Sequence, residues 1–375
     1  MTKHYTDEGT LLIRNSDIKD GKFEFGDNPI YLEKTFAEKN ETRMHQIGDV
    51  ITVHTGDVGT SAVITENEAK SIGFATIVTR PNPKIIDSNY LCSFLNTDKH
   101  KKWAVSISTG DGRTNYNLGD YFELVVPVPS IAEQKRIASY IQKLNRLITL
   151  HQRKYDKLTN VKKSMLEKMF PKNGSNVPEI RFKGFSDAWE QRKLGEIGSV
   201  SMCRRIFKEQ TSENGEIPFY KIGTFGGEAD AFISRELFEE YKAKYQYPKK
   251  GDILISASGS IGRTVVFTGK NEYFQDSNIV WLNHDKHLDN SFLKCFYSIV
   301  KWAGIEGSTI KRLYNDNILN TAITLPSVEE QQKIGAYFEN LDNLITLHQR
   351  KPIVVNSSST MNALPNQHLY FQVLE

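Results

Sequence analysis

The sequence contains few of the residue patterns with which proteins carry out covalent chemistry. It has no phosphate-binding GxxxxGK[ST] loop and no Gly-rich nucleotide fingerprint between a strand and a helix. The serine-rich run 256–262 (SASGSIG) lacks the G-x-S-x-G spacing of a nucleophile elbow. The run 284–287 (HDKH) lies in a polar stretch, which favours a solvated loop over a metal site. We therefore predict neither a catalytic site nor a metal site in this chain.

Polar and basic side chains instead recur on stretches that are typical of loops. Arg and Lys hydrogen-bond to the edges of guanine, Asn pairs with adenine, and all of them can bind phosphates. For each residue an ordinary surface role is the alternative, but as a set repeated along the chain they favour DNA. The candidate DNA contacts are Arg14, Asn15, Arg113, Asn115, Tyr116, Arg204, Arg205, Lys221, Ser258, Ser260, Arg263, Lys311, Arg312 and Tyr314.

These loops belong to two tandem copies of one unit. Residues 133–154 (EQKRIASYIQKLNRLITLHQRK) return as residues 330–351 (EQQKIGAYFENLDNLITLHQRK), with 13 of 22 positions identical. Upstream, residues 48–59 (GDVITVHTGDVG) correspond to residues 251–262 (GDILISASGSIG). Each copy is a globular part followed by a helical part. A repeat of two copies is too short for a stacked array and suits a target with two similar halves.

Both helical parts begin with a helix-start pattern. Ser130 and Ser327 are each followed three residues later by Glu, which predicts a capping box. Apolar residues then recur at alternating steps of four and three, the spacing of a coiled coil. We expect the two helices to pair antiparallel, with His151 and His348 at matching positions as ordinary interface histidines. The predicted seam is Ile137, Ile141, Leu144, Ile148, Tyr155 and Leu158 in the first copy, and Ile334, Phe338, Leu341 and Ile345 in the second.

The globular parts mix short apolar runs with Gly, Asn and Asp turns, a pattern typical of strands and hairpins. Residues 11–18 (LLIRNSDI) fall roughly opposite residues 218–225 (PFYKIGTF), and residues 88–96 and 290–300 favour short helices. Each globular part is predicted to have a curved, mostly antiparallel sheet. The fold class is therefore α+β: two tandem α/β domains joined by long antiparallel coiled-coil helices, with pseudo-two-fold symmetry.

The composition of the connecting segments sets the predicted domain limits. Pro, Gly and Asn mark the linker between the two copies, and its aromatic residues indicate that it docks. The predicted order is a globular domain at 1–129, a spacer helix at 130–170, a linker at 171–188, a second globular domain at 189–326, a truncated spacer helix at 327–351 and a disordered or foreign tail at 352–375.

Charge and cysteine usage narrow the class of protein. The net charge is +3, but residues 131–170 alone carry ten basic and three acidic residues, which can attract phosphate or an acidic partner. The three cysteines have no metal-binding spacing, which favours reduced thiols. No apolar run approaches the ~20 residues of a membrane span, and the N-terminus lacks the apolar core of a signal peptide. We expect a cytoplasmic protein.

The chain resembles the specificity subunit of type I restriction–modification systems over about residues 9–351. The resemblance is carried by the repeated helical motif, by the Gly-Asp strand-turn, and by residues 176–197 (NVPEIRFKGFSDAWEQRKLGEI). It implies that each globular part is a target-recognition domain that reads one half of a split double-stranded DNA site. It also implies that the helices hold the two domains apart and dock two methyltransferase subunits. Compared with the family pattern, the chain looks trimmed at its start and in its last helix.

The same resemblance implies that the chemistry lies in partner subunits. The methyltransferase subunits would bind S-adenosylmethionine and methylate adenine, and motor-nuclease subunits would cleave unmodified DNA with ATP and Mg. The chain itself would be non-catalytic and hold no cofactor. Two alternatives remain open from the residues: a recognition subunit whose partner fuses nuclease and methyltransferase, and a two-domain coiled-coil adaptor that does not bind DNA.

Overall fold

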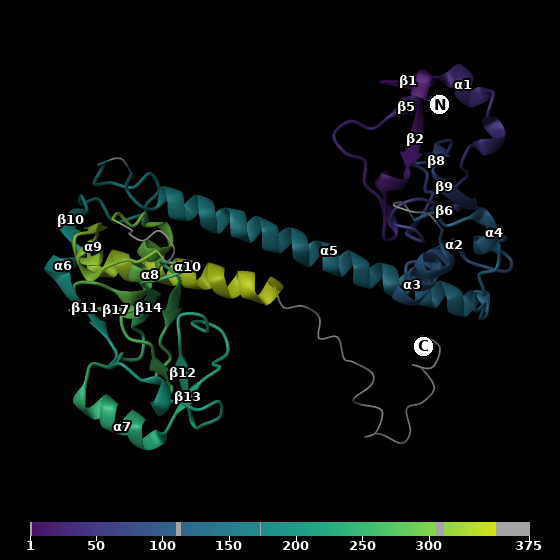
Figure 1. The fold of residues 1–375 in the computed structure, drawn as a ribbon. Helices are drawn as coiled ribbons and strands as arrows, with labels where there is room; N and C mark the ends of the chain where they lie inside the picture. Colours follow the sequence, from purple (N-terminus) through teal and green to yellow (C-terminus); the bar gives the residue numbers. More distant parts are fainter. Residues whose placement is uncertain (1, 110–113, 173, 305–310, 350–375) are drawn as a thin grey trace. The chain divides into compact units, whose positions relative to one another are not determined.

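The computed structural model describes residues 2–109, 114–172, 174–304 and 311–349. The chain forms two compact units, unit 1 (Met1–Leu150) and unit 2 (His151–Glu375), shown in Figure 1. Their boundary falls inside one continuous helix, α5 (Ile131–Lys168). Among the helices that the model describes, none combines the length and the apolar character needed to cross a membrane.

Unit 1 has small sheets of strand order β1-β5-β2-β8, β7-β6-β9 and β3-β4. Its strands are β1 (Tyr5–Thr6), β2 (Thr10–Arg14), β3 (Ile18–Lys19), β4 (Lys22–Phe23), β5 (Tyr31–Leu32), β6 (Val50–Val53), β7 (Ser61–Val63), β8 (Ile72–Phe74) and β9 (Thr76–Thr79). Its helices are α1 (Lys34–Glu38), α2 (Ser88–Leu95), α3 (Asp98–Ile107), α4 (Leu118–Phe122) and the first part of α5, with 3-10 turns at Thr2–His4, Asn15–Asp17 and Glu41–Arg43.

Unit 2 has sheets of order β11-β17-β14-β15, β13-β12-β16 and β10-β18. Its strands are β10 (Glu190–Lys193), β11 (Gly198–Met202), β12 (Ile217–Tyr220), β13 (Phe232–Ile233), β14 (Ile253–Ser256), β15 (Thr264–Val266), β16 (Tyr273–Phe274), β17 (Ile279–His284) and β18 (Ala322–Leu325). Its helices are the rest of α5, α6 (Leu194–Ile197), α7 (Arg235–Lys244), α8 (Asn290–Ile299), α9 (Asn315–Leu319) and α10 (Val328–Gln349), with a 3-10 turn at Lys208–Gln210.

The α+β class is confirmed, and the described strand pairs are mostly antiparallel as predicted, but the expectation of a single sheet per domain is wrong. Each unit divides its strands among small sheets, and each contains a parallel pair, β2 with β8 and β12 with β16. The division follows a sharp turn in the chain at Ala75 (φ 58°) and Ser277 (φ 53°). Because of this turn, β9 and β17 join a different sheet from the strands that precede them.

The repeat seen in the sequence recurs in the three-dimensional elements. Strands β7-β6-β9 of unit 1 correspond to β15-β14-β17 of unit 2. The two predicted short helices are confirmed as α2 and α8, and each is capped by an aspartate. Asp87 accepts the backbone amides of Asn89 and Tyr90 at 3.0 Å. Asp289 does the same for Ser291 at 2.9 Å, which satisfies amides left free at the helix start.

A buried glutamine fastens each spacer helix to its own domain. Gln134 is fully buried; its amide oxygen accepts from the Asp87 backbone at 2.8 Å, and its amide nitrogen donates to the carbonyls of Ile85 (3.0 Å) and Pro129 (2.8 Å). Gln331 makes the equivalent bonds in unit 2, to Asp289, His287 and Pro326, at 2.8, 3.0 and 3.0 Å. All polar atoms of this side chain are satisfied, so the helix start is held in a defined place.

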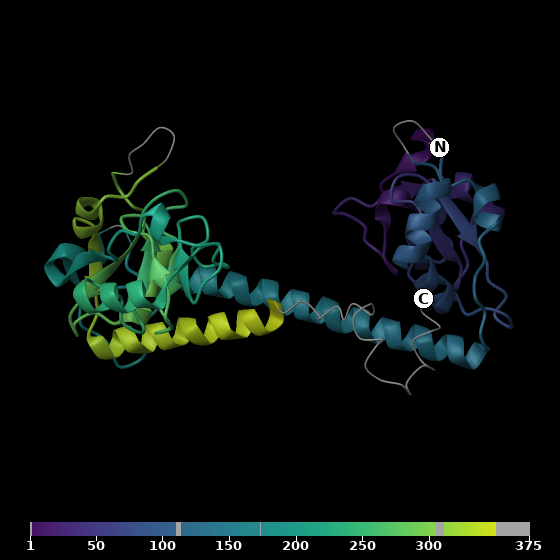
Figure 2. The same cartoon turned by 60° about the horizontal axis from the view of Figure 1, so that its bottom comes forward.

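In unit 2, α10 packs antiparallel against the part of α5 that follows His151, as Figures 1 and 2 show. The Nδ1 atoms of His151 and His348 are 2.8 Å apart, and Lys162 forms an ion pair with Asp342. The buried apolar residues Leu166, Met169, Ile334, Phe338 and Leu341 belong to one core, and Leu158 and Met165 pack against it. The predicted antiparallel pairing is confirmed for this part of the helix.

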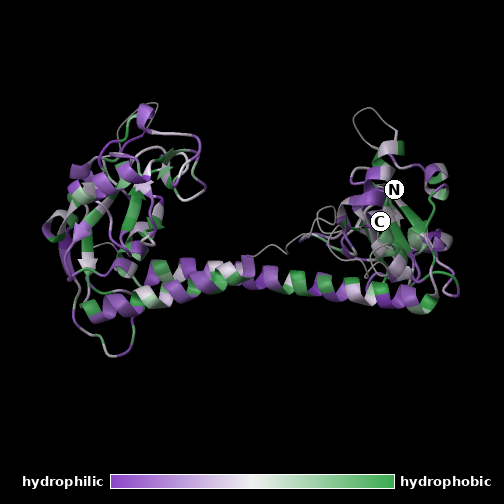
Figure 3. Cartoon of the chain, turned by 90° about the horizontal axis from the view of Figure 1, so that it is seen from below, coloured by the Kyte–Doolittle hydropathy of each residue, from purple (hydrophilic) through white to green (hydrophobic). Residues whose placement is uncertain are grey.

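Part of the predicted seam is exposed among the described residues. In unit 1, Leu144 and Ile148 are 41% and 57% exposed, although the heptad pattern predicts contact with the second helix. The cause is the register, since pairing at His151 and His348 sets α10 against the residues after His151. Ile137, Ile141, Tyr155 and Ile345 are half-buried. Figure 3 shows the apolar positions recurring along α5 between hydrophilic ones.

The capping boxes form only in part. The hydroxyl oxygens of Ser130 and Ser327 accept the amides three residues on, each at 3.3 Å, as predicted. The carboxylate of Glu330, however, receives two hydrogen bonds from Arg181 in the linker, at 2.7 and 2.8 Å. The linker therefore docks on unit 2, and Trp189 next to it is 2% exposed.

Candidate nucleic-acid interface

Three loops of unit 2 are joined by backbone hydrogen bonds into what we call the loop frame of unit 2 (residues 257–263, 276–278 and 311–314). The amide of Ala257 donates to the Asn278 carbonyl at 2.7 Å, and the amide of Leu313 donates to the Ala257 carbonyl at 2.8 Å. The amide of Gly259 donates to the Lys311 carbonyl at 3.2 Å. The frame holds loops from distant parts of the chain in one place.

Unit 1 builds the same structure, the loop frame of unit 1 (residues 54–60, 75 and 114–116). The amide of His54 donates to the Ala75 carbonyl at 3.1 Å, and the amide of Tyr116 donates to the His54 carbonyl at 2.8 Å. The amide of Gly56 donates to the Thr114 carbonyl at 3.1 Å. These donors and acceptors occupy the repeat positions of those in unit 2. The backbone of the two frames is therefore built twice on one plan.

The Gly-x-x-Gly turn at the tip of each frame needs glycine at its second position. Gly59 and Gly262 have φ of +84° and +85°, in the left-handed region that side chains rarely adopt. A Cβ on Gly59 would lie 3.1 Å from Cε1 of His100, and one on Gly262 would lie 3.1 Å from Nε1 of Trp302. The second glycine of the motif that the sequence singles out is thus a requirement of the backbone.

The frame of unit 2 presents hydrogen-bond donors on its surface. Ser260, Lys311 and Arg312 are exposed, and Tyr314 is 49% exposed. The exposed guanidinium of Arg263 donates to the Ile222 carbonyl at 2.9 Å and lies 5.4 Å from the centre of a phenylalanine ring. This arrangement fixes Arg263 by stacking while its group remains accessible.

Further basic residues lie near this frame, and each contacts an acidic or aromatic side chain. Arg205 is held by Asp276 of the frame at 2.8 Å, and Lys221 pairs with Asp230 at 2.8 Å. Arg204 lies 5.2 Å from the centre of the Tyr245 ring. Exposed pairs of this kind contribute little to stability, so the cations remain able to exchange their partner for a phosphate.

The candidate residues of unit 1 are largely committed to the protein itself. Asn15 donates to the Thr55 carbonyl at 2.6 Å, and the amide oxygen of Asn115 accepts from the Thr55 hydroxyl at 2.9 Å. The hydrogen bonds from Arg14 to the buried Asp17 raise the pKa of Arg14 and hold its guanidinium in place. These residues shape the frame, and what they leave for a ligand is limited to their remaining polar atoms.

Two of the predicted contacts are wrong as surface contacts. Tyr116 is fully buried in the core, with its hydroxyl 3.2 Å from Nε2 of His100. Ser258 is 4% exposed, and its hydroxyl donates to the Asn278 side chain at 2.7 Å. Both are buried residues that support the loop frames from the protein interior. Arg113 lies outside the described residues.

Sequence reasoning misses Asn278, which binds two parts of the loop 257–263 through its backbone and its side chain. No spacing marks it, because it occurs in an ordinary polar turn. It also misses Gln134 and Gln331, although the repeated Glu-Gln pair that opens both helices is a signal that could have found them.

The histidines of the run 284–287, which the sequence predicts to be non-catalytic, interact with nearby polar side chains. His284 contacts Asn290 at 2.8 Å, and His287 contacts Asp285 at 2.9 Å. Within the described ranges no group of three or more metal-ligating side chains gathers. Burial raises the pKa of each cysteine thiol to about 12, so the thiols are poor nucleophiles near neutral pH.

Known proteins have related sequences. The chain is 56% identical over 170 residues to a protein of Haemophilus influenzae described as a type I restriction enzyme specificity subunit; the match covers 44% of each chain. It is 24% identical over 324 residues to the MjaX specificity subunit of Methanocaldococcus jannaschii, covering 81% of this chain and 74% of that one. The chain thus spans less than half of the first relative.

Solved structures give the same fold. The S subunit of the type I restriction–modification system of M. genitalium matches with a TM-score of 0.59 at 14% identity, covering 93% of this chain and 86% of that one. Residues 4–160 and residues 186–357 each match the type I restriction modification DNA specificity domain. These two matches take in both loop frames, α10 and residues 131–160 of α5, and the chain belongs to this family of DNA specificity domains.

Proposed function

We propose that this chain is the DNA sequence-specificity subunit of a type I restriction–modification complex. Each unit reads one half of a bipartite, gapped site in double-stranded DNA through its loop frame. The chain is non-catalytic and supplies recognition to the partners that carry out the chemistry. A cytoplasmic location stays a prediction.

The observation that carries this proposal is the pair of loop frames with one backbone plan and different exposed side chains. Asn115 of unit 1 stands where unit 2 has Arg312, and Thr114 stands where unit 2 has Lys311. Backbone positions set the geometry of approach to DNA, whereas the side chains at the base edges set the sequence that is read. Two frames of this kind suit a site with two unlike halves.

The partners that we propose are supported by membership of the family and by the presence of two spacer helices. The spacer helices dock methyltransferase subunits, which bind S-adenosylmethionine and methylate adenine. Motor-nuclease subunits use ATP and Mg to cleave DNA that lacks the methyl groups. Because a methyltransferase must reach an adenine inside the duplex, the recognition units hold the DNA while the target base is extruded into the partner.

The proposal is tested by selecting bound duplexes from a random DNA pool with the purified full chain, and by measuring affinity against salt. The expected result is enrichment of one motif and a steep loss of affinity with salt, at about 0.9 log units per log unit for each neutralised phosphate. No binding to DNA even at low salt would support the adaptor alternative and overturn the proposal.

A further inference from the structure

Unit 2 has a second basic surface outside its loop frame, which we call the lysine groove (residues 242–250, 267 and 269). It lies at the C-terminal end of α7 and before the start of β14, with a volume of about 800 Å³. Figure 1 shows α7 well apart from α10, and no residue of a spacer helix lines the groove. Residues 241–250 (YKAKYQYPKK) contain four lysines, all exposed, and no acidic residue. The groove therefore concentrates positive charge on an open surface.

Two of the four lysines have no ion-pair partner. Lys244 pairs with Glu240 at 2.9 Å, and the ammonium group of Lys242 lies 5.0 Å from the centre of a phenylalanine ring. Neither Lys249 nor Lys250 forms an ion pair within the part of the chain that the structure describes. The stem of Lys250 lies against the backbone at residue 269, which leaves its charged end in solvent. These two cations are therefore available to an anion from outside the chain.

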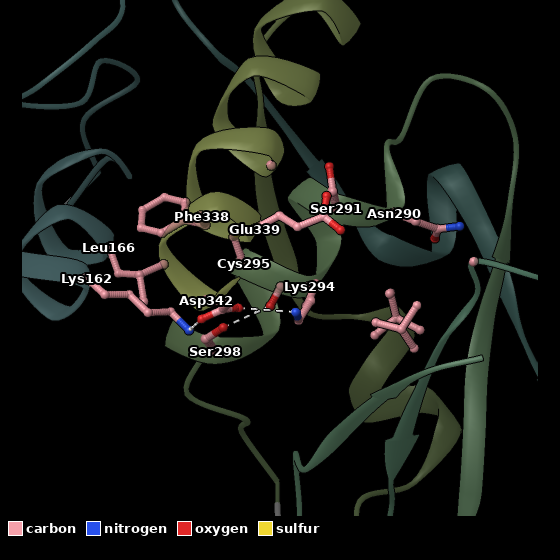
Figure 4. Close-up of a pocket in the computed structure, with 14 residues that line it drawn as sticks. Lys162, Leu166, Asn290, Ser291, Lys294, Cys295, Ser298, Phe338, Glu339 and Asp342 are labelled. Carbon is pink, nitrogen blue, oxygen red and sulfur yellow. Dashed lines mark hydrogen bonds and ion pairs between the residues drawn. The ribbon is translucent and has the colours of Figure 1, made fainter. Parts of the chain in front are cut away.

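The other groove of unit 2 shows a different use of lysine. Between α5, α8 and α10, Lys162 and Lys294 both form ion pairs with Asp342, as Figure 4 shows. All three side chains are partly buried, so the shared carboxylate neutralises cations that the packing of the helices brings together. No acidic side chain lines the lysine groove among the described residues. Its charge is therefore not balanced within the fold.

The internal repeat shows that the backbone does not require lysine at these positions. In unit 2 the carboxylate of Asp252 accepts the amide of Lys249 at 2.7 Å, and in unit 1 Asp49 accepts the amide of Gln46 at 2.7 Å. The same bond thus holds the same turn in both units. Unit 1 has Gln46 and the isoleucine after it where unit 2 has the two unpaired lysines. The lysine pair is a feature of unit 2 alone.

The lysine groove is continuous with the basic residues near the loop frame. The four residues of β14 separate the groove from the frame by about 13 Å. Along the surface, the guanidinium of Arg204 lies 5.2 Å from the centre of the Tyr245 ring, which lines the groove. The adjoining Arg205 is bonded to Asp276 of the frame at 2.8 Å. A duplex rises about 3.4 Å per base pair, so the separation matches about four base pairs.

We propose that the lysine groove of unit 2 binds the phosphates of the duplex that flanks the half-site read by its loop frame. Lys249 and Lys250 contact the DNA backbone and no base edge, so they add affinity without sequence preference. Because unit 1 lacks this pair, the flank is bound at one end of the bipartite site only. The inference rests on the proposed function for the identity of the DNA, and it adds a surface and an asymmetry to that function.

The test compares the selected duplex with versions lengthened by about ten base pairs, or one helical turn, at either end. Fluorescence anisotropy with the full chain should show about tenfold tighter binding for lengthening at one end and less than about twofold for the other. The favourable extension should also steepen the salt dependence by about 1.8 log units per log unit, which is two phosphates at about 0.9 each.

The double variant Lys249→Gln/Lys250→Ile introduces the residues that unit 1 has, so the turn is preserved. It should remove both the gain from the extension and the added salt dependence. Affinity for the unextended duplex and the selected motif should not change. The matched control is Lys183→Gln/Lys286→Gln, because both are exposed lysines of unit 2 outside the groove. The control should keep the full gain.

Four results would overturn the inference. An equal gain for the wild type and the groove variant would place the flanking contact elsewhere, and a gain that the control also loses would mean general attraction. No gain at either end, with selective binding of the unextended duplex intact, would leave the proposed function standing without this surface. Binding of poly-glutamate that the groove variant abolishes, without a gain from longer DNA, would identify an acidic protein segment as the occupant. Failure to bind even the unextended duplex would contradict the proposed function as well.

Discussion

Single side chains in the loop frames divide into those that hold the backbone and those that face solvent. The side chains of Asn115 and Ser258 form hydrogen bonds to neighbouring loops, whereas Lys311 and Arg312 are exposed. A buried amide or hydroxyl that lost its partner would be costly, so the first group is constrained by the fold. The second group is free to be matched to a DNA sequence.

Replacing Arg312 with Ala is expected to weaken binding of the selected DNA by 1–3 kcal/mol, about 5- to 150-fold, if this side chain reads a base. The motif should then relax at one position of one half-site. Anisotropy titrations with the selected duplex and with single-base variants measure both effects.

Arg235→Ala is the matched control, because Arg235 on α7 is an exposed arginine of unit 2 that forms an ion pair with Glu216. It should change affinity by less than twofold, as exposed ion pairs contribute about 0–1 kcal/mol to stability. A uniform loss for Arg312→Ala on every sequence, with a reduced salt slope, would assign Arg312 to a phosphate instead.

His45 gives unit 1 a predicted pH dependence. Burial lowers the pKa of His45 to about 4, whereas an unfolded histidine has a pKa near 6.5. Between these values the unfolded chain binds the proton more strongly, so stability is complete above about pH 6.5 and falls as the pH approaches 4. The loss attributable to His45 is up to about 3 kcal/mol.

Urea unfolding of the wild type and of His45→Gln across this pH range measures the effect as a difference between two curves. The variant should lose the part of the pH dependence that His45 causes. Burial also lowers the pKa of His100, which therefore contributes in the same direction in both proteins. Parallel curves for the two proteins would contradict the prediction.

For single residues, the sequence predicts which loops form the candidate DNA interface better than it predicts which side chains of these loops are exposed. The Gly-x-x-Gly turn and the run before α9 are visible as polar loops, and the structure joins them in one frame. Burial separates Tyr116 from Tyr314, yet both are tyrosines beside Asn and basic residues in the sequence. Only the long-range contacts with His100 and the core decide which of the two is hidden.

Among the elements, the spacer helices depend on a glutamine at their first turn. Gln134 and Gln331 each tie a helix start to the cap of the preceding short helix and to two backbone carbonyls. The same bonds occur in both units at almost the same distances. The geometry between each globular domain and its helix is therefore set locally, by one side chain.

Gln331→Leu is expected to lower the unfolding free energy of unit 2 by about 2–4 kcal/mol. It removes three hydrogen bonds and leaves their backbone partners without this side chain. Gln332→Leu is the control, since Gln332 is the exposed neighbour on the same helix and should change stability by less than about 0.5 kcal/mol. Equal stabilities of the two variants would show that the hydrogen bonds of Gln331 contribute little to the stability of unit 2.

The helices are the elements that the sequence predicts best. Their starts, the heptad seam and the antiparallel pairing after His151 all follow from periodicity and capping. The exposed Leu144 and Ile148 do not, because a heptad pattern records that a face is apolar and not which segment covers it. The small sheets are also missed, since strand pairing across long loops leaves no local signal.

For the whole molecule, the internal repeat is the feature on which the proposed function rests. Each unit builds a loop frame on the same backbone plan and equips it with different side chains. A protein that reads a palindromic DNA site would need two loop frames with identical exposed side chains. Unlike frames on one chain instead predict a site of two unlike halves, read together.

The most direct measurement is to co-express the full chain with the proposed methyltransferase partner and to map N6-methyladenine across the host DNA by sequencing. The account predicts methylation in one split motif with a fixed gap, and Arg312→Ala should alter only one of its halves. Methylation at a palindrome made of a single half-site would contradict reading by two unlike frames. A stable complex that binds DNA without any sequence preference would contradict the account as a whole.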